Sequence, residues 1–179
     1  MAERECLFCA IGAGKIPSKK VYENDEAVAF LDINPRNRGH TLIVPKKHYG
    51  TIMDMPEDEA VELFKIVKRI ASAAKEGVEA DGVNIGQNNG KSAGQVIPHV
   101  HFHVIPRFDT DKVKAGAEAL LPPLKLEEAE MNDILKKIKE NMGEETAKPK
   151  PEPKQEKEVD FDEENQNEDK DFKKINFDF

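Results

Sequence analysis

The sequence of 179 residues contains no tryptophan, only two cysteines and few aromatic residues, which make up 6% of the chain. No apolar run approaches the roughly 18 residues that a membrane-spanning helix requires, so we expect no membrane contact. Residues 1–5 (MAERE) lack the apolar segment of a secretory signal peptide, which predicts a cytoplasmic protein. The 27 basic residues are outnumbered by 35 acidic residues. This balance argues against broad nucleic-acid binding, because such binding needs a basic surface.

The charge is distributed unevenly along the chain. Residues 144–179 carry 13 acidic and 7 basic residues, whereas residues 1–143 carry 22 acidic and 20 basic residues. Residues 144–179 also contain alternating prolines and few apolar side chains, which is typical of disorder. We therefore predict one folded domain over residues 1–143 and an acidic disordered tail over residues 144–179. The tail ends in the apolar run 172–179 (FKKINFDF), which is either a solvated end or a short motif that docks on a protein partner.

Three of the five histidines, His99, His101 and His103, alternate with apolar residues in the run 98–106 (PHVHFHVIP). Side chains in a strand alternate between its two faces, so the three imidazoles are predicted to share one face and the apolar side chains the core face. An ordinary half-buried histidine explains a single position, but not three. The pattern favours either nucleophilic catalysis or metal ligation.

Hydrophobic periodicity and turn residues predict the remaining elements. The expected strands cover residues 26–32, 40–45, 81–87 and 99–107, and the expected helices cover residues 56–76 and 126–142. The loop 88–94 (NNGKSAG) leads almost directly into the histidine strand. Its glycines allow close approach of a ligand, and its N–H groups could cradle a phosphate, although most such loops are only turns.

Cys6 and Cys9 form a C-x-x-C pair near the start of the chain. In a reducing compartment this spacing favours half of a metal site or a redox motif over a structural disulfide.

The run 99–105 (HVHFHVI) has the form His-φ-His-φ-His-φ-φ, where φ is apolar, and on this basis the chain resembles the histidine triad (HIT) family. Other motifs that support the resemblance are 6–9 (CLFC), 16–17 (IP), 30–35 (FLDINP), 39–48 (GHTLIVPKKH) and 94–95 (GQ). The resemblance covers roughly residues 4–108. It implies an α+β fold with a five-stranded antiparallel sheet, a long helix and a C-terminal helix, together with a homodimer and a pocket for a purine nucleotide.

The resemblance also implies roles for individual residues. Asp32 would hold the ribose hydroxyls, His101 would be the nucleophile, His103 would stabilise the phosphate oxygens, and His40 would orient His101 by fixing its tautomer. The residues implied to line the base pocket are Phe8, Ile11, Phe30, Leu31 and Ile33. Those implied to surround the α-phosphate are Asn88, Gly94, Gln95, His101 and His103.

The implied activity is hydrolysis at the α-phosphate of purine nucleoside phosphoramidates or dinucleoside polyphosphates, with release of AMP. A nucleotidyl-histidine intermediate would split one difficult step into two easier ones, without a catalytic cofactor. The third triad position is His103 rather than the glutamine that accompanies nucleotidyl transfer in the wider superfamily, which favours hydrolysis. Val96 stands where some members carry a hydroxyl residue that contacts the leaving group, so the leaving group stays open between an amine and a phosphate.

Cys6, Cys9, His48 and His99 would form a structural Cys₂His₂ zinc site if the N-terminal segment packs beside the histidine strand. Two other functions compete with hydrolysis. One is a nucleotide-binding regulatory module whose tail recruits a partner, and the other is a metal-dependent enzyme that uses the triad as ligands.

Overall fold

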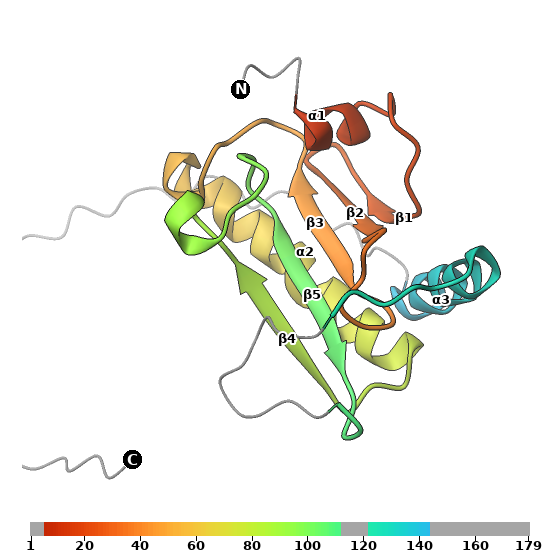
Figure 1. The fold of residues 1–179 in the computed structure, drawn as a ribbon. Helices are drawn as coiled ribbons and strands as arrows, with labels where there is room; N and C mark the ends of the chain where they lie inside the picture. The colour runs from red at the N-terminus through yellow and green to blue at the C-terminus, as the bar shows by residue number, and fades with distance from the viewer. Residues whose placement is uncertain (1–5, 112–121, 144–179) are drawn as a thin grey trace, which may run out of the picture. The chain divides into compact units, whose positions relative to one another are not determined.

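A five-stranded antiparallel sheet organises the chain (Figure 1). The computed structural model describes residues 6–111 and 122–143. The strands are β1 (Lys20–Glu23), β2 (Ala27–Leu31), β3 (Thr41–Pro45), β4 (Gly82–Gln87) and β5 (Phe102–Arg107), in the order β1-β2-β3-β5-β4. The predicted α+β class and the five-stranded antiparallel sheet are confirmed.

One face of the sheet is covered by α2 (Glu57–Gly77) and α3 (Glu128–Asn141). Three acidic residues in the first turn of α2 stabilise the start of this helix, because the helix dipole is positive there. The buried side of α2 includes Leu63, Val67 and Ile70, which recur at the helical period. Phe64 is 51% exposed, although its ring contacts the core residue Phe102 with the ring centroids 6.1 Å apart.

Helix α3 packs directly against the end of α2. A Cβ atom on Gly77 would lie 2.9 Å from the backbone nitrogen of Ile138, so the two helices approach too closely there for a larger residue. Arg69 of α2 donates a hydrogen bond to the main-chain oxygen of Met142, at the C-terminus of α3, at 3.1 Å. Both helices were predicted from the sequence within two residues at each end.

The opposite face of the sheet is covered by the short helix α1 (Leu7–Gly12). Strand β2 shows how the two faces divide, because Ala29 and Leu31 pack toward α2 whereas Val28 and Phe30 pack toward α1. This division follows from the period of two along a strand. All five residues of β2 and of β3 are buried, so both strands read as continuous apolar runs.

Strand β5 places the histidines between two neighbours. His103 lies opposite Leu42 of β3 and opposite Gly86 of β4. Val100, Phe102 and Val104 belong to the core beneath α2, as the alternation predicts. The strand begins at Phe102, three residues later than predicted, so His99 and His101 precede the hydrogen-bonded ladder.

Within the described ranges, no helix combines the length and the apolar composition needed to cross a membrane. The predicted acidic tail, residues 144–179, lies outside the described residues.

Candidate functional site

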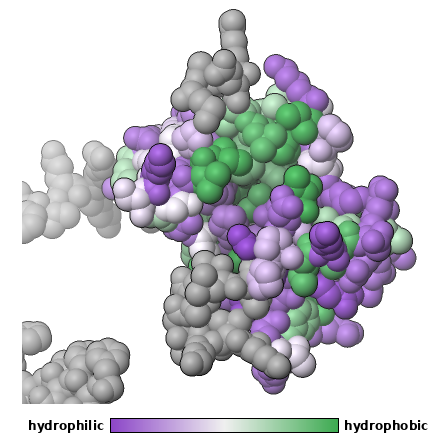
Figure 2. Space-filling view, viewed as in Figure 1, coloured by the Kyte–Doolittle hydropathy of each residue, from purple (hydrophilic) through white to green (hydrophobic). Residues whose placement is uncertain are grey.

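A cavity of about 330 Å³ opens beside the triad on the α1 face of the sheet. Apolar side chains gather around α1 on this side of the molecule (Figure 2). The walls of the cavity come from α1, from the loop before β1, from the end of β2 and from the segment before the triad. The sequence-predicted site residues that line it are Phe8, Ile11, Phe30, Leu31, Asp32, Ile33, Gly94, His101 and His103. The structure thus brings together residues that are far apart in the sequence.

The main chain determines which nitrogen of His101 carries the proton. Its Nδ1 lies 2.7 Å from the main-chain oxygen of His99, and because a carbonyl only accepts, Nδ1 must donate. The lone pair is then on Nε2. Burial lowers the pKa of His101 below its usual range, so the imidazole is neutral near pH 7. A neutral imidazole with a lone pair on Nε2 is the form required of a nucleophile.

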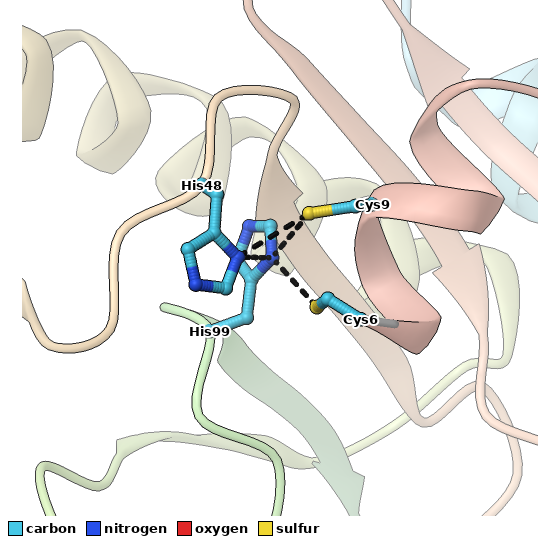
Figure 3. Close-up of side chains that lie close together, drawn as sticks. All are labelled: Cys6, Cys9, His48 and His99. Carbon is cyan, nitrogen blue, oxygen red and sulfur yellow. Dashed lines mark hydrogen bonds between the residues drawn. The ribbon is translucent and has the colours of Figure 1, made fainter. Parts of the chain in front are cut away.

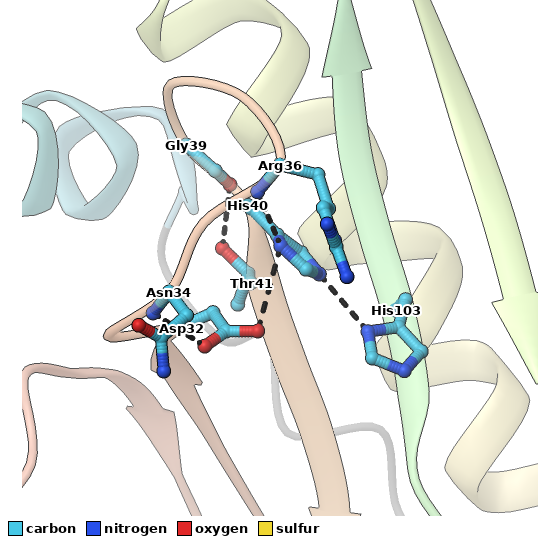
Figure 4. Close-up of polar contacts among 7 residues, drawn as sticks. All are labelled: Asp32, Asn34, Arg36, Gly39, His40, Thr41 and His103. Carbon is cyan, nitrogen blue, oxygen red and sulfur yellow. Dashed lines mark hydrogen bonds and ion pairs between the residues drawn. The ribbon is translucent and has the colours of Figure 1, made fainter. Parts of the chain in front are cut away.

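His103 is held in the opposite tautomer (Figure 4). The backbone N–H of Arg36 donates to His40 Nδ1 at 3.1 Å, so the proton of His40 is on Nε2. His40 Nε2 donates in turn to His103 Nδ1 at 3.0 Å, which leaves the proton of His103 on its own Nε2. Burial lowers the pKa of both imidazoles, that of His103 to about 4. His103 is therefore a neutral hydrogen-bond donor, whereas His101 offers a lone pair.

This arrangement corrects one prediction. The sequence analysis assigned His40 to fix the tautomer of His101, but His40 contacts His103, and the carbonyl of His99 orients His101 instead. The reason is the antiparallel pairing of β3 with β5, because Leu42 lies opposite His103 and brings the start of β3 beside that residue.

Asp32 directly follows β2, and one oxygen of its carboxylate accepts a hydrogen bond within the chain. Its Oδ1 accepts the backbone N–H of Asn34 at 2.9 Å. Its Oδ2 lies 3.5 Å from His40 Nδ1, but that nitrogen already accepts the N–H of Arg36 and has no proton to share. Oδ2 thus keeps acceptor capacity toward the cavity, which suits a pair of ligand hydroxyl groups.

The loop before the triad differs from the predicted phosphate cradle. The backbone N–H groups of Ala93, Gly94 and Gln95 all donate to oxygens within the loop, at 3.0–3.1 Å. These three N–H groups are therefore engaged within the loop, and the phosphate cradle stays a prediction. Gly90 and Gly94 have φ angles of 82° and 85°, which turn the loop tightly enough to satisfy its own donors.

Gln95 and Asn88 are absent from the described lining of the cavity. The side chain of Gln95 accepts the N–H of Gly90 at 2.7 Å and donates to the oxygen of Gly50 at 2.7 Å. Asn88 packs against Gly94, since a Cβ atom there would lie 3.6 Å from Asn88 Nδ2. The hydrogen bonds of Gln95 thus hold the loop against Gly50.

Four further predicted residues converge in a second cluster beside the cavity (Figure 3). The sulfur of Cys6 lies 3.3 Å from His99 Nδ1, and the sulfur of Cys9 lies 3.3 Å from His48 Nδ1. The Nδ1 atoms of His48 and His99 lie 3.2 Å apart. Two thiols outside any disulfide and two imidazoles share one centre, and together they form a donor set able to hold a metal ion.

The hydrogen bonding around His99 fits a metal ligand. Its Nε2 lies 2.9 Å from the main-chain oxygen of Pro45, which can only accept, so Nε2 carries the proton and Nδ1 keeps its lone pair toward the cluster. Burial and the neighbouring His48 lower the pKa of His99 to about 4, so the ring stays neutral. The sulfur and nitrogen atoms of the cluster all lie within 4.8 Å of one another.

Two properties of the cavity escaped the sequence analysis. Among the described residues that line it, Asp32 is an acid and none is a lysine or an arginine. Ser18 also lines the cavity, and its hydroxyl oxygen is buried with no hydrogen-bond partner in the described part of the chain. The motif at residues 16–17 pointed to this segment, but no sequence signal distinguishes an unpaired serine.

The chain is similar in sequence and in structure to known proteins of one family. The HIT domain family matches residues 13–110. The chain is 47% identical over 136 residues to an uncharacterized HIT-like protein of Methanocaldococcus jannaschii, covering 75% of this chain and 98% of that relative. It is 45% identical over 104 residues to the adenosine 5′-monophosphoramidase of Saccharomyces cerevisiae, covering 58% and 63%. A Zn-bound histidine triad family protein from Mycobacterium smegmatis has a similar structure, with a TM-score of 0.67, 35% identity and coverage of 78% and 96%.

Proposed function

The chain belongs to the HIT domain family, and from this premise we propose that it hydrolyses purine nucleoside 5′-phosphoramidates. The observation that carries the proposal is the complementary state of two neighbouring imidazoles. His101 Nε2 offers a lone pair, and His103 Nε2 offers a proton for hydrogen bonding, with the ring centroids 5.0 Å apart. The yeast relative named as an adenosine 5′-monophosphoramidase supports the reaction class.

The cavity suits a nucleoside monophosphate group. We place the base among the apolar side chains of Phe8, Ile11 and Phe30, because their aromatic and aliphatic surfaces would bury its two faces. Asp32 Oδ2 would accept the ribose hydroxyls. The α-phosphate would then lie beside His101 and His103.

In the first step His101 Nε2 attacks the α-phosphorus. A phosphorus–nitrogen bond to His101 forms, the bond to the leaving nitrogen breaks, and that nitrogen takes a proton from solvent and departs as an amine. In the second step water attacks phosphorus, the bond to His101 breaks, a proton returns to solvent, and the nucleoside monophosphate is released. His103 would donate a hydrogen bond to a phosphoryl oxygen throughout, which stabilises the charge that develops there.

The charge of the cavity favours an amine over a phosphate as the leaving group. A dinucleoside polyphosphate brings several negative charges beyond the α-phosphate, but the described lining provides no lysine or arginine to meet them. Val96 lines the cavity and is 88% exposed, so the group nearest to it contacts an apolar surface. Such a lining offers no Coulombic stabilisation to the additional negative charges of a polyphosphate.

The test compares AMP release from adenosine 5′-phosphoramidate and from diadenosine tetraphosphate. We expect turnover of the phosphoramidate to be favoured by at least tenfold in kcat/KM. His101→Ala is the matched control, and reactions of the unmodified protein quenched with alkali, in which a phosphorus–nitrogen bond to histidine is stable, should contain a covalent nucleotidyl adduct that this variant lacks. Binding of AMP without release from either substrate would instead support the regulatory module.

We further propose that the Cys₂His₂ cluster of Cys6, Cys9, His48 and His99 holds zinc in a structural role. The donor set supports this, as do the hydrogen bond from His99 Nε2 to the main-chain oxygen of Pro45 and the Zn-bound relative. A closed set of four protein ligands leaves no position for substrate. A reducing compartment would keep both thiols available, and metal analysis of the purified protein tests the assignment.

The sheet also supports a homodimer. Strand β4 forms one edge of the sheet, and the apolar side chains of Val61, Phe64 and Ile85 are 56%, 51% and 44% exposed. An unpaired edge beside exposed apolar groups suits pairing with a second copy of the chain. Sedimentation should show a dimer, and Phe64→Glu should shift it toward the monomer.

A further inference from the structure

One residue, His99, belongs to both the metal cluster and the nucleotide site. Its side chain is fully buried, and its Nδ1 faces the sulfur of Cys6 at 3.3 Å (Figure 3). Its main-chain oxygen accepts the hydrogen bond that orients His101, at 2.7 Å. A change in the position of this ring therefore reaches the carbonyl that fixes the nucleophile.

Helix α1 connects the two sites by a second route. Cys6 is its N-cap and Cys9 lies within it, whereas Phe8 and Ile11 face the cavity. The ring of Phe8 contacts His101 edge-on, with centroids 5.1 Å apart. The helix together with its N-cap residue thus carries two of the four candidate metal ligands and part of the nucleotide pocket.

Apolar packing of Phe8 and Ile11 on the sheet holds α1, whereas its own hydrogen bonding contributes little. Helices this short are not stable on their own, and Cys6 provides no side-chain capping hydrogen bond. The contacts of its thiols with the imidazoles, at 3.3–3.5 Å, involve sulfur, which is a weak hydrogen-bonding partner. A metal ion would replace these weak contacts with bonds from α1 to His48 and His99.

We propose that the two sites are coupled, so that a metal ion bound by the four side chains fixes α1 and raises the affinity of the cavity for a nucleotide. This inference rests on the proposed nucleotide-binding function. Coupling between two bound ligands is reciprocal, so a nucleotide must raise the affinity for the metal by the same factor. We expect about tenfold, within the usual range for coupled sites.

The test is to titrate AMP calorimetrically into zinc-loaded and zinc-free protein, and to measure zinc affinity by competition with a chromogenic chelator, with and without saturating AMP. Both ratios should be about tenfold and equal to each other. Equal AMP affinities in the two forms would overturn the coupling alone. Absence of AMP binding in both forms would overturn the proposed function as well.

A second measurement does not depend on the folding of the zinc-free protein. Cobalt in place of zinc reports the geometry of its ligands through visible absorption, and saturating AMP should shift this spectrum in the loaded protein. Phe8→Ala keeps all four ligands but should reduce the shift by at least half when AMP is again saturating. Ile138→Val, in the distant core of α3, is the matched control and should keep the full shift. An unchanged spectrum at saturating AMP would overturn the proposal.

Discussion

His99 and His101 are two residues apart, yet the structure prepares them for different chemistry. His99 gives its Nε2 proton to the oxygen of Pro45, which leaves Nδ1 for the metal cluster. His101 gives its Nδ1 proton to the oxygen of His99, which leaves Nε2 for the cavity. In both cases a main-chain carbonyl determines the tautomer. The comparison teaches that the function of each imidazole depends on its hydrogen-bond acceptor more than on its place in the motif.

The largest effect should separate these two histidines. His101→Ala should lower kcat/KM for the phosphoramidate by a factor on the order of 10⁴, because it removes the nucleophile, while thermal stability changes little. His99→Ala should instead reduce the metal content and the unfolding temperature. Steady-state kinetics and thermal denaturation of both variants make the comparison. Equal losses of stability in the two variants would contradict the division of roles.

Metal removal should affect stability more than any surface substitution. Binding to the folded state stabilises a protein by about 4 kcal/mol when the free metal is 1,000 times its dissociation constant. At about 2–4 °C per kcal/mol for a chain of this size, a strong chelator should lower the unfolding temperature by roughly 10 °C. Differential scanning calorimetry measures this.

The control for metal removal is the double variant C6S/C9S, which lacks both thiolate ligands. It should melt at the same temperature with and without chelator. A chelator response that persisted in this variant would place the metal somewhere other than the cluster.

The sequence was sufficient to predict the parts of the fold that have a strong period. The alternation through residues 99–104 separated the histidine face from the core face, and the hydrophobic periodicity predicted a helix over residues 56–76, where α2 lies. Strand β1 was not identified from its residue pattern. It has four residues, one of them buried, and its pairing with β2 is irregular between Lys20 and Tyr22.

The sequence also identified most residues of the site but not how they are connected. Residue types and spacing indicated His40, His101 and His103, but the tautomers depend on the main chain of Arg36 and His99, which no side-chain pattern encodes. The sequence likewise did not reveal that main-chain oxygens of the loop accept the N–H groups of Ala93, Gly94 and Gln95.

Acid should destabilise the protein through the buried pair His40 and His103. Both have pKa values lowered by burial, that of His103 to about 4, whereas a histidine in the unfolded chain titrates near 6.5. Between these values the unfolded chain binds protons that the folded chain does not, so this contribution is fully present above about pH 6.5 and is lost as the pH falls toward 4. We expect a loss of about 2–4 kcal/mol between pH 7 and 5.

Urea unfolding at several pH values measures this loss. His103→Gln is the matched variant, since it removes one titrating group and should reduce the pH slope between 6.5 and 5. A slope that is unchanged in this variant would show that other groups cause the acid sensitivity.

The contact between His40 and His103 should matter for turnover but not for AMP binding. His40→Ala removes the donor that holds His103 Nδ1, so the His103 proton is no longer directed to the phosphate. Loss of one such hydrogen bond to developing charge typically costs about 10²-fold in kcat. We expect that decrease in kcat with little change in KM. Conversely, a decrease confined to KM would show that His40 acts on binding alone.

The smallest effect concerns Ser18, which lines the cavity. Its hydroxyl is buried, unpaired among the described residues and adjacent to the cavity, and a buried hydroxyl without a partner costs roughly 1–3 kcal/mol. Because β1 and β2 run antiparallel, with the Leu31 nitrogen donating to the Lys19 oxygen at 3.0 Å, Ser18 lies close to Asp32 along the sheet edge. We therefore predict that the hydroxyl binds an acceptor on the nucleoside near the ribose.

Ser18→Ala should weaken AMP binding by about three- to tenfold by calorimetry and leave kcat unchanged, whereas Ser18→Thr should keep most of the affinity. Equal affinity in the alanine variant would mean that the hydroxyl does not contact the nucleotide.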